Sequence, residues 1–358
     1  MKFEDIAKTF TKKELQDSEV ELTGEIPFDT VAPYREQALK NITAEAEMPG
    51  FRKGHVPTDM VLKKVGEMAI LEEAVEILMR DFYPELVDVL KLDVVGRPDI
   101  RITKLTPGAP VEITIKTPLY PVVELPKHWR DVSKDIAIET VSDILDSEVD
   151  EALQSIRRAH AKATSPESPE NTPTSEVKSE DLPALDDAFA QSLGKFADLA
   201  ELKTKLRENL KLEKEQQTKD KRRGMIVEKL LEQTKVAIPA VFVESELEKI
   251  INQLKEDITR FGLTFEQYLK KTNKTEDAVR DEFRDQAGKR AKLQLALNKL
   301  ADQEKVEADK ETVEQEMKHA LEHFPDARPE LVKIHIETVL RNEKVLQMLE
   351  GGSETKIN

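Results

Sequence analysis

One short segment carries the residue types best suited to bind a partner, namely Met48-Pro49-Gly50-Phe51-Arg52-Lys53-Gly54-His55-Val56-Pro57. Its glycines and prolines favour an irregular loop, because glycine permits positive φ and proline cannot continue a helix. Phe51 can bury apolar area, while Arg52 can pair with a carboxylate or a phosphate. Residues 48–64 have a local charge of +3 in a chain of net charge −16, because four Lys and Arg residues oppose Asp59 alone. The segment therefore predicts a docking site for an anionic partner.

In the alternative interpretation, Phe51 folds back onto its own helices while Arg52 and Lys53 are merely solvated.

The rest of the chain offers little chemistry. His319 and His323 are four residues apart on an expected helix and could in principle ligate a metal. No cysteine and no His-Glu-x-x-His pattern accompanies them, so the sequence favours surface histidines and predicts no metal site and no cofactor. His128, His160 and His335 are isolated in the sequence and are also expected at the surface. The acidic residues form no distinctive acid–base pair and no glycine-rich phosphate cradle is present, so we expect no catalytic residue.

Composition narrows the class of protein. The 358 residues suggest two or three domains, and only 12 glycines with 5% aromatic residues favour long helices over turn-rich β structure. The net charge of −16 argues against general binding to nucleic acids or anionic membranes. The first residues lack an apolar signal region, and no apolar run is long enough to span a membrane, so we expect a cytoplasmic protein with no membrane partner.

The docking segment is expected to lie in an α+β domain covering residues 1–118. Val20, Leu22 and Ile26 alternate with polar residues in a strand over 18–27, and strands are also expected at 98–103 and 110–117. A helix is expected from about residue 30 to 47, before the segment. A second helix after Pro57 has an amphipathic face formed by Val61, Val65, Met68, Val75 and Leu78.

The remaining chain is expected to be mostly helical. Residues 119–163 should form an extended connector followed by a helix from about 142 to 162. Ten of the nineteen residues over 164–182 are Ser, Thr or Pro, which predicts a disordered acidic linker. Residues 183–358 predict long antiparallel helices, with one helix starting at Pro239 and a break at Pro325 and Pro329 before the last.

Four segments together resemble the trigger factor family, the bacterial ribosome-associated chaperones. Residues 50–57 resemble its G-F-R-x-G-K-x-P loop, although His55 stands where the family has lysine. Residues 182–190 resemble its L-P-x-L-D-D-x-F-A segment, residues 236–244 its V-x-I-P-x-x-x-V-E helix start, and residues 261–269 its G-x-T-x-E-Q-Y-L segment.

The resemblance implies an α+β ribosome-binding domain followed by a mainly α-helical C-terminal body with helical arms. It implies that the ribosome, through protein and rRNA at the nascent-chain exit, is bound by Gly50, Phe51, Arg52, Lys53, Gly54, His55 and Pro57. The family usually inserts an FKBP-like prolyl isomerase domain before the L-P-x-L-D-D segment. Nineteen mostly polar residues at 164–182 cannot form that domain, so we expect it to be absent and the chain not to be an enzyme.

Unfolded nascent polypeptides are the second expected partner. Apolar residues left uncovered on long helices could bind them weakly, since Met and Phe adapt to many partners. The candidates are Met225, Phe242, Phe261, Phe265, Phe283, Met317, Phe324 and Met348. A homodimer off the ribosome is left open.

The function expected from the sequence is therefore that of an ATP-independent chaperone at the ribosomal exit, which shields apolar segments of new proteins. Two alternatives remain. One is a prolyl isomerase with an unrecognised site, and the other is a ribosome-independent scaffold or assembly chaperone.

Overall fold

The structure, a computed structural model, describes residues 2–164 and 182–351. The chain folds into two compact units, each built from two separate stretches of sequence. Unit 1 comprises Met1–Pro126 and Gln233–Glu307, and unit 2 comprises Lys127–Glu232 and Ala308–Asn358. The domain boundaries expected at residues 118, 163 and 182 stay predictions.

A four-stranded antiparallel sheet forms the N-terminal part of unit 1. The strands are β1 (Thr11–Glu14), β2 (Glu19–Ile26), β3 (Asp99–Lys104) and β4 (Val111–Pro118), in the order β1-β2-β4-β3. Alternate residues of the two central strands are buried, among them Leu22 on β2 and Ile113 on β4. The three strands expected from alternating apolar residues are confirmed. The exposed strand β1 has no such pattern and was missed.

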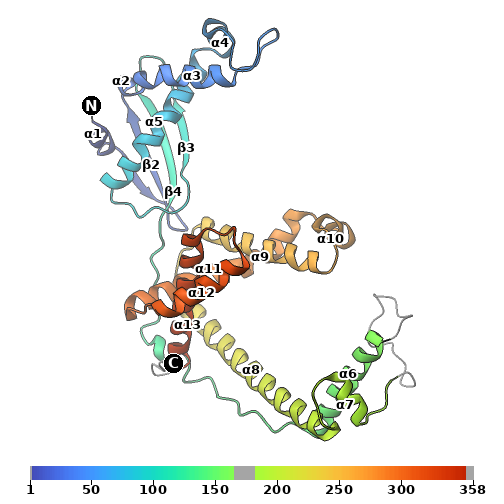
Figure 1. The fold of residues 1–358 in the computed structure, drawn as a ribbon. Helices are drawn as coiled ribbons and strands as arrows, with labels where there is room; N and C mark the ends of the chain where they lie inside the picture. The colour runs from blue at the N-terminus through green and yellow to red at the C-terminus, as the bar shows by residue number, and fades with distance from the viewer. Residues whose placement is uncertain (1, 165–181, 352–358) are drawn as a thin grey trace. The chain divides into compact units, whose positions relative to one another are not determined.

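Helices accompany this sheet, and α5 covers its buried face. The helices of this part are α1 (Phe3–Ala7), α2 (Phe28–Val31), the 3₁₀ helix η1 (Ala32–Tyr34), α3 (Arg35–Glu45), α4 (Thr58–Val65), which packs on α3 and α5, and α5 (Glu67–Val89). Figure 1 shows α5 lying over the strands. Phe82 of α5 is fully buried and packs against the rings of Phe3 and Phe10, with ring centroids 5.5 Å apart in each case. The α+β fold expected for this region is confirmed.

The helix expected after Pro57 is interrupted. Gly66 has φ +85° and separates α4 from α5, a backbone conformation that few other residues adopt. The amphipathic face expected across both helices is therefore wrong in part, because the helical period does not continue through Gly66. Val61, Val75 and Leu78 are buried, whereas Val65 and Met68 are exposed.

The second part of unit 1 is helical. It contains α9 (Ala240–Arg260), α10 (Phe265–Thr272) and α11 (Glu276–Glu304), in which α9 and α11 pack together through an apolar cluster that includes Leu247, Ile251 and Val279. Thr264 caps α10 in a capping box with Gln267, a local signal that fixes where that helix starts.

The regular secondary structure in the described residues of unit 2 is helical, and an irregular stretch over 132–145 precedes α6. The helices are η2 (Trp129–Asp131), α6 (Asp146–Thr164), α7 (Asp187–Leu193), α8 (Leu199–Gln233), α12 (Lys310–His323) and α13 (Pro329–Leu349). A small core joins α6, α7 and α8 through Leu153, Ala190 and Leu202. The guanidinium of Arg223 on α8 pairs with Glu343 of α13 at 2.8 Å and with Glu350 just after it.

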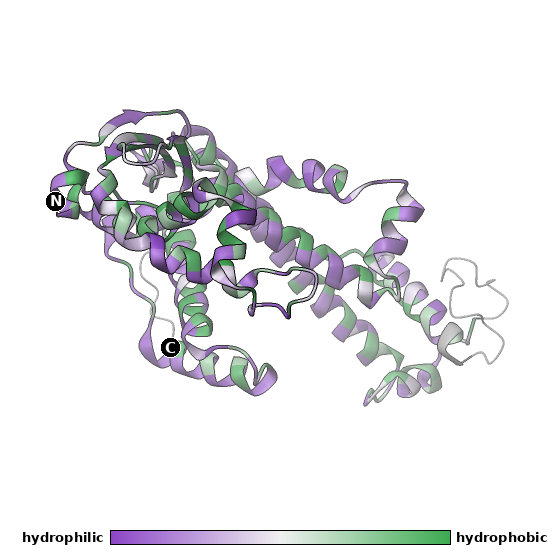
Figure 2. Cartoon of the chain, turned by 90° about the horizontal axis from the view of Figure 1, so that it is seen from above, coloured by the Kyte–Doolittle hydropathy of each residue, from purple (hydrophilic) through white to green (hydrophobic). Residues whose placement is uncertain are grey.

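The mainly helical C-terminal region expected from the sequence is confirmed, including the helix start after Pro239 and the break between α12 and α13. The linker predicted over 164–182 lies outside the described residues, apart from Thr164 at the end of α6 and Leu182. Polar residues recur along all the long helices (Figure 2). Among residues 2–164 and 182–351, no helix is both long and apolar enough to cross a membrane.

Candidate functional site

The predicted docking segment forms a loop between α3 and α4, closed by backbone hydrogen bonds. The Gly54 amide donates to the Ala46 carbonyl at 3.2 Å, which joins the two sides of the loop. Within it, the Phe51 amide donates to the Met48 carbonyl at 3.0 Å and the His55 amide to the Arg52 carbonyl at 2.9 Å. Two successive turns thus hold residues 46–57, which we call the docking loop.

Two glycines allow these turns. Gly50 has φ +89° and Gly54 has φ +77°, in the region that favours glycine. A Cβ atom on Gly54 would also lie 3.0 Å from the Ala44 carbonyl oxygen, whereas the space around Gly50 is open. The sequence-based expectation of a tight irregular loop is confirmed.

The docking loop presents an aromatic ring and cations to solvent. Phe51 is 39% exposed, and Arg52, Lys53 and His55 are exposed as well. Val56, only 3% exposed, anchors the loop's end. Phe51 is thus partly covered by the loop and partly open to solvent, and the alternative in which it folds back onto its own helices is not decided by this exposure.

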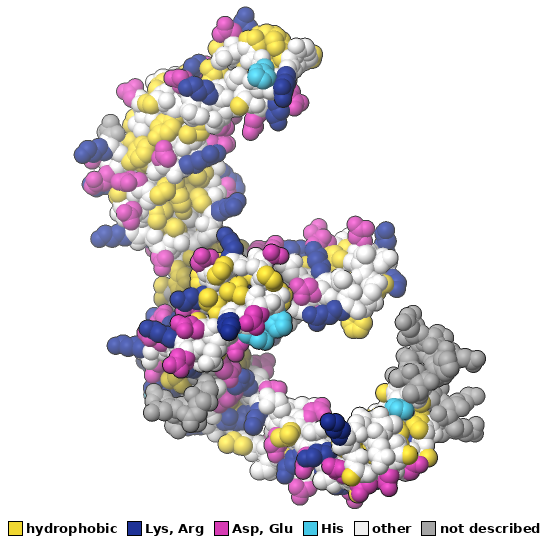
Figure 3. Space-filling view, in the orientation of Figure 1, with side chains coloured by type: hydrophobic (Ala, Val, Ile, Leu, Met, Phe, Trp, Pro, Cys, Tyr) yellow, Lys and Arg dark blue, Asp and Glu magenta, His cyan; other side chains and the backbone are white. Residues whose placement is uncertain are grey.

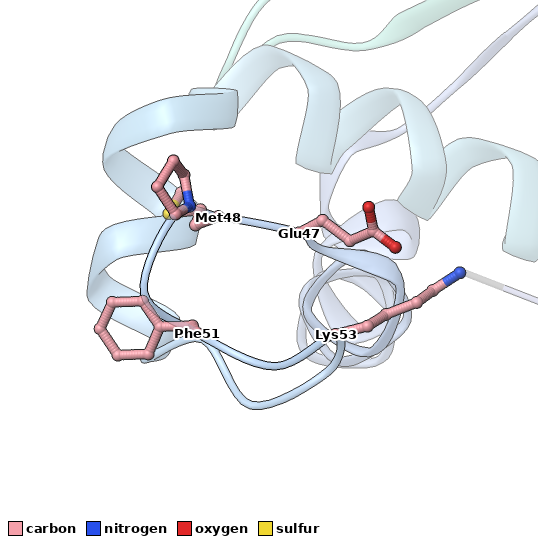
Figure 4. Close-up of a pocket in the computed structure, with 5 residues that line it drawn as sticks. Glu47, Met48, Phe51 and Lys53 are labelled. Carbon is pink, nitrogen blue, oxygen red and sulfur yellow. The ribbon is translucent and has the colours of Figure 1, made fainter.

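A shallow hollow of about 330 Å³ lies on the docking loop, lined by Glu47, Met48, Pro49, Phe51 and Lys53. Figure 4 shows Met48 and Phe51 on one side of the hollow and the charged side chains of Glu47 and Lys53 on the other. The arrangement can bury an apolar group of a partner while an anion pairs with a cation beside it.

Exposed apolar residues extend beyond the loop. Met60, Val65 and Met68 on α4 and the start of α5 are exposed, and hydrophobic side chains gather at this end of the N-terminal region (Figure 3). The Lys64 ammonium on α4 donates to the Glu47 carbonyl at 3.2 Å and joins that helix to the loop. The sequence analysis did not predict that these apolar residues are exposed. Gly66 could have indicated it, because a glycine at that position ends one helix and starts another.

The eight residues expected to bind unfolded chains are not gathered into one site. Phe242, Phe261, Phe265 and Phe283 lie in unit 1, and Met225, Met317, Phe324 and Met348 lie in unit 2. Phe261 is 84% exposed and Phe324 69%, and Met225 is also exposed.

The other five candidates are half-buried, and the three phenylalanines among them have structural contacts. The ring of Phe265 stacks on Tyr268 at 6.2 Å between centroids, under the Lys255 ammonium at 4.8 Å. Phe242 meets the Tyr120 ring edge-on at 5.9 Å. Phe283 packs against the α9–α11 cluster.

Three exposed residues on α13 were not among the candidates. Leu331, Ile334 and Val339 are 51%, 59% and 50% exposed. The spacing of apolar residues predicted the helix, but spacing alone does not show which of these residues are buried by packing against other elements.

The histidines are mostly at the surface. His128 and His335 are exposed, while the His160 ring packs edge-on against Phe189 at 5.5 Å between centroids. His319 and His323 face each other on α12, with 3.3 Å between their Nε2 atoms. Within the described residues, no group of three or more His, Cys, Asp or Glu side chains is arranged to hold a metal ion.

Comparison with known proteins gives a consistent result over most of the chain. Residues 8–156 match the family model described as "Bacterial trigger factor protein (TF)", and residues 198–350 match "Bacterial trigger factor protein (TF) C-terminus". Residues 157–197, between the two matches, are covered by neither.

Curated relatives agree. A trigger factor of Bacillus pumilus is 25% identical over 85% of this chain and 89% of its own length. A trigger factor of Staphylococcus epidermidis is 24% identical over 97% of this chain and 98% of its own length. Among solved structures, one titled "Promiscuous Substrate Recognition in Folding and Assembly Activities of the Trigger Factor Chaperone" is 18% identical with a TM-score of 0.51, and covers 96% of this chain and 99% of the other. At that identity the structural likeness concerns the fold.

Proposed function

The chain belongs to the trigger factor family, and on this basis we propose that it is an ATP-independent chaperone that docks at the ribosomal nascent-chain exit through the loop of residues 46–57. The observation that carries the proposal is the loop itself. Glycines at positive φ and the buried Val56 hold Phe51, Arg52 and Lys53 exposed on one short segment. Phe51 would bury apolar area on the ribosomal surface, while Arg52 would pair with a carboxylate or phosphate.

Charge supports the role of Arg52 and Lys53. Residues 48–64 have a local charge of +3 in a chain of net charge −16, so an anionic surface is attracted to this end of the N-terminal region rather than to the rest of the chain. Arg52 and Lys53 are the cations of the docking loop itself, and His55 stands where the family has lysine. Binding should therefore weaken as salt is raised.

Co-sedimentation with vacant ribosomes tests the docking proposal. Phe51→Ala/Arg52→Ala/Lys53→Ala should reduce the bound fraction severalfold at low salt. Phe261→Ala/Arg260→Ala/Lys271→Ala is a matched control, because it removes one exposed phenylalanine and two exposed cations elsewhere and should bind like the unchanged protein. Equal binding by the two triple variants would refute docking through the loop.

We propose further that the exposed apolar residues of the helical regions shield unfolded segments. Phe261 and Phe324 are the most exposed of the candidates and carry flat rings that accept many partners. Each contact would be weak, and docking beside the exit would compensate through a high local concentration of client. A several-fold excess of the purified protein, without ATP, should reduce light scattering by a chemically denatured client, and unchanged scattering would contradict the shielding role.

The same proposal assigns no isomerase reaction to the chain. The family matches leave only residues 157–197 between them, and that stretch also includes the end of α6 and all of α7. Too few residues remain for a separate domain with a sheet and an enclosed pocket. A proline-peptide isomerisation assay is the direct test, and a rate above the uncatalysed one would restore the enzymatic alternative.

A further inference from the structure

We propose that His319 and His323 form a two-histidine binding site for a divalent transition-metal ion such as Zn²⁺. Both residues are exposed on the last turns of α12, four positions apart, so their side chains lie on the same face of the helix. The spacing of the two histidines in the sequence does not by itself indicate a metal site, since two surface histidines would have the same spacing. The structure adds the arrangement of the two rings relative to each other.

The distance between the two nitrogens suits a metal. Zn²⁺ binds imidazole nitrogen at about 2.0–2.1 Å in tetrahedral geometry, which places two ligand nitrogens about 3.3–3.4 Å apart. The Nε2 atoms of His319 and His323 are 3.3 Å apart. The rings are at 75° to each other with centroids 4.7 Å apart. Directing both lone pairs at one ion would require a turn about χ2, which is a soft torsion in histidine.

Without a metal, one Nε2 can donate its proton to the other at this distance, which requires the accepting ring to be neutral. When a cation binds, the donating ring carries its proton on Nδ1 instead, and both Nε2 atoms give a lone pair to the cation.

The residues near the pair in the sequence carry charges of both signs. Glu316, Glu322 and Asp326 are exposed carboxylates, and Lys318 beside His319 is an exposed cation. None of the carboxylates completes a group of three ligands among the described residues, so water would fill the remaining positions. Imidazole with water suits Zn²⁺, Ni²⁺ and Cu²⁺ rather than Mg²⁺ or Ca²⁺.

A metal held at positions i and i+4 would tie together the last turn of α12. The helix ends at His323, and the 69% exposed Phe324 follows directly. The structural consequence would be a more ordered end of α12 beside an exposed apolar side chain.

Isothermal titration of the full-length, untagged chain with ZnCl₂ at neutral pH tests the proposal. His319→Gln/His323→Gln should weaken Zn²⁺ binding at least about tenfold, because two ligands on one helix act as a chelate. His128→Gln/His335→Gln removes two exposed histidines outside α12 and should bind Zn²⁺ like the unchanged chain. Absence of Zn²⁺ binding by the unchanged chain, or equal binding by the two double variants, would overturn the proposal.

Copper provides a second, spectroscopic readout. Electron paramagnetic resonance of the chain with one equivalent of Cu²⁺ should show coupling to two imidazole nitrogens. His319→Gln and His323→Gln should each reduce that coupling to one nitrogen. If either single variant keeps the two-nitrogen spectrum, the paired site does not exist.

Discussion

Helices α5 and α13 are of similar length and both carry many apolar residues, yet they differ in what they bury. Eight residues of the 23-residue α5 are buried, from Ile70 to Leu86, whereas only Val345 and Leu349 are buried in the 21-residue α13. A sheet and several helices pack on α5, while the described part of unit 2, which contains α13, has helices and no sheet. Apolar periodicity thus gives a helix an apolar face, but that face is buried only where a second layer of secondary structure packs on it.

Truncation of a leucine on α5 and of an isoleucine on α13 should give the largest difference in stability between the two helices. Leu78→Ala on α5 should lower the free energy of unfolding by about 2–5 kcal/mol, since Leu78 is fully buried and a cavity would remain. Ile334→Ala on α13 should change it by no more than about 0.5 kcal/mol, because that side chain is already 59% exposed. Urea unfolding measures both, and similar losses would mean that α13 is covered in solution.

Added volume should show how tightly the layer around α5 is packed. A Cβ atom on Gly24 of β2 would lie 2.5–2.6 Å from ring atoms of Phe10, which packs against Phe82 of α5. Gly24→Ala should therefore cost about 1–3 kcal/mol of stability.

Gly288→Ala in α11 is the matched control, because a Cβ atom there meets no other atom within 4 Å. It should stabilise the protein by about 0.5–1 kcal/mol through helix propensity. Thermal unfolding compares the two variants, and stabilisation by both would show that Phe10 moves aside freely.

The ion pair at the start of α5 should contribute little. The Glu67 carboxylate accepts two hydrogen bonds from the Arg35 guanidinium of α3, at 2.5 and 2.6 Å, and these bonds lower the pKa of Glu67. A lowered folded-state pKa gives stability that is present above the unfolded-state pKa and lost as the pH falls through the folded one.

Glu67→Gln should thus cost about 0.2–1 kcal/mol at pH 7, because the pair is partly exposed. The difference from the unchanged chain should begin to shrink as the pH falls through the unfolded-state pKa of glutamate, about 4.3, and should disappear only below the lowered pKa of the folded state. Glu76→Gln, an exposed change on the same helix, is the control. A Glu67→Gln effect that stays constant from pH 7 to pH 3 would rule out the charged pair as its cause.

The exposed face of α13 should matter for shielding and not for stability. Leu331→Ala/Ile334→Ala should leave the free energy of unfolding within about 0.5 kcal/mol of the unchanged value. It should weaken the suppression of client aggregation, because two apolar contacts are lost. Lys333→Ala/Glu337→Ala, which removes a surface ion pair from the same helix, should leave suppression unchanged. Equal suppression by the two variants would remove α13 from the client surface.

Much of the fold was readable from the sequence. Alternation of Val20, Leu22 and Ile26 identified β2, and the prolines at 325 and 329 marked the break between the last two helices. The exposed strand β1 was not readable, since a strand held at a sheet edge by its neighbour needs no apolar pattern of its own.

The candidate site was readable only in part. The glycines and prolines around Phe51 identified the loop, because few residue types permit its turns. The apolar residues beside it, Met60, Val65 and Met68, were not identified as exposed, because Gly66 ends one helical period and starts another.

Residue types alone set the local backbone, since positive φ at Gly50 and Gly54 and the helix start after Pro239 depend on the residues themselves. They also set the charge contrast between the docking loop and the rest of the chain. Packing in three dimensions was needed to show which apolar residues are covered and which face solvent, as with Leu78 and Ile334. It was needed as well to show how near the rings of His319 and His323 lie. Burial and side-chain distance depend on neighbours from other parts of the chain or on rotamers, and a linear pattern encodes neither.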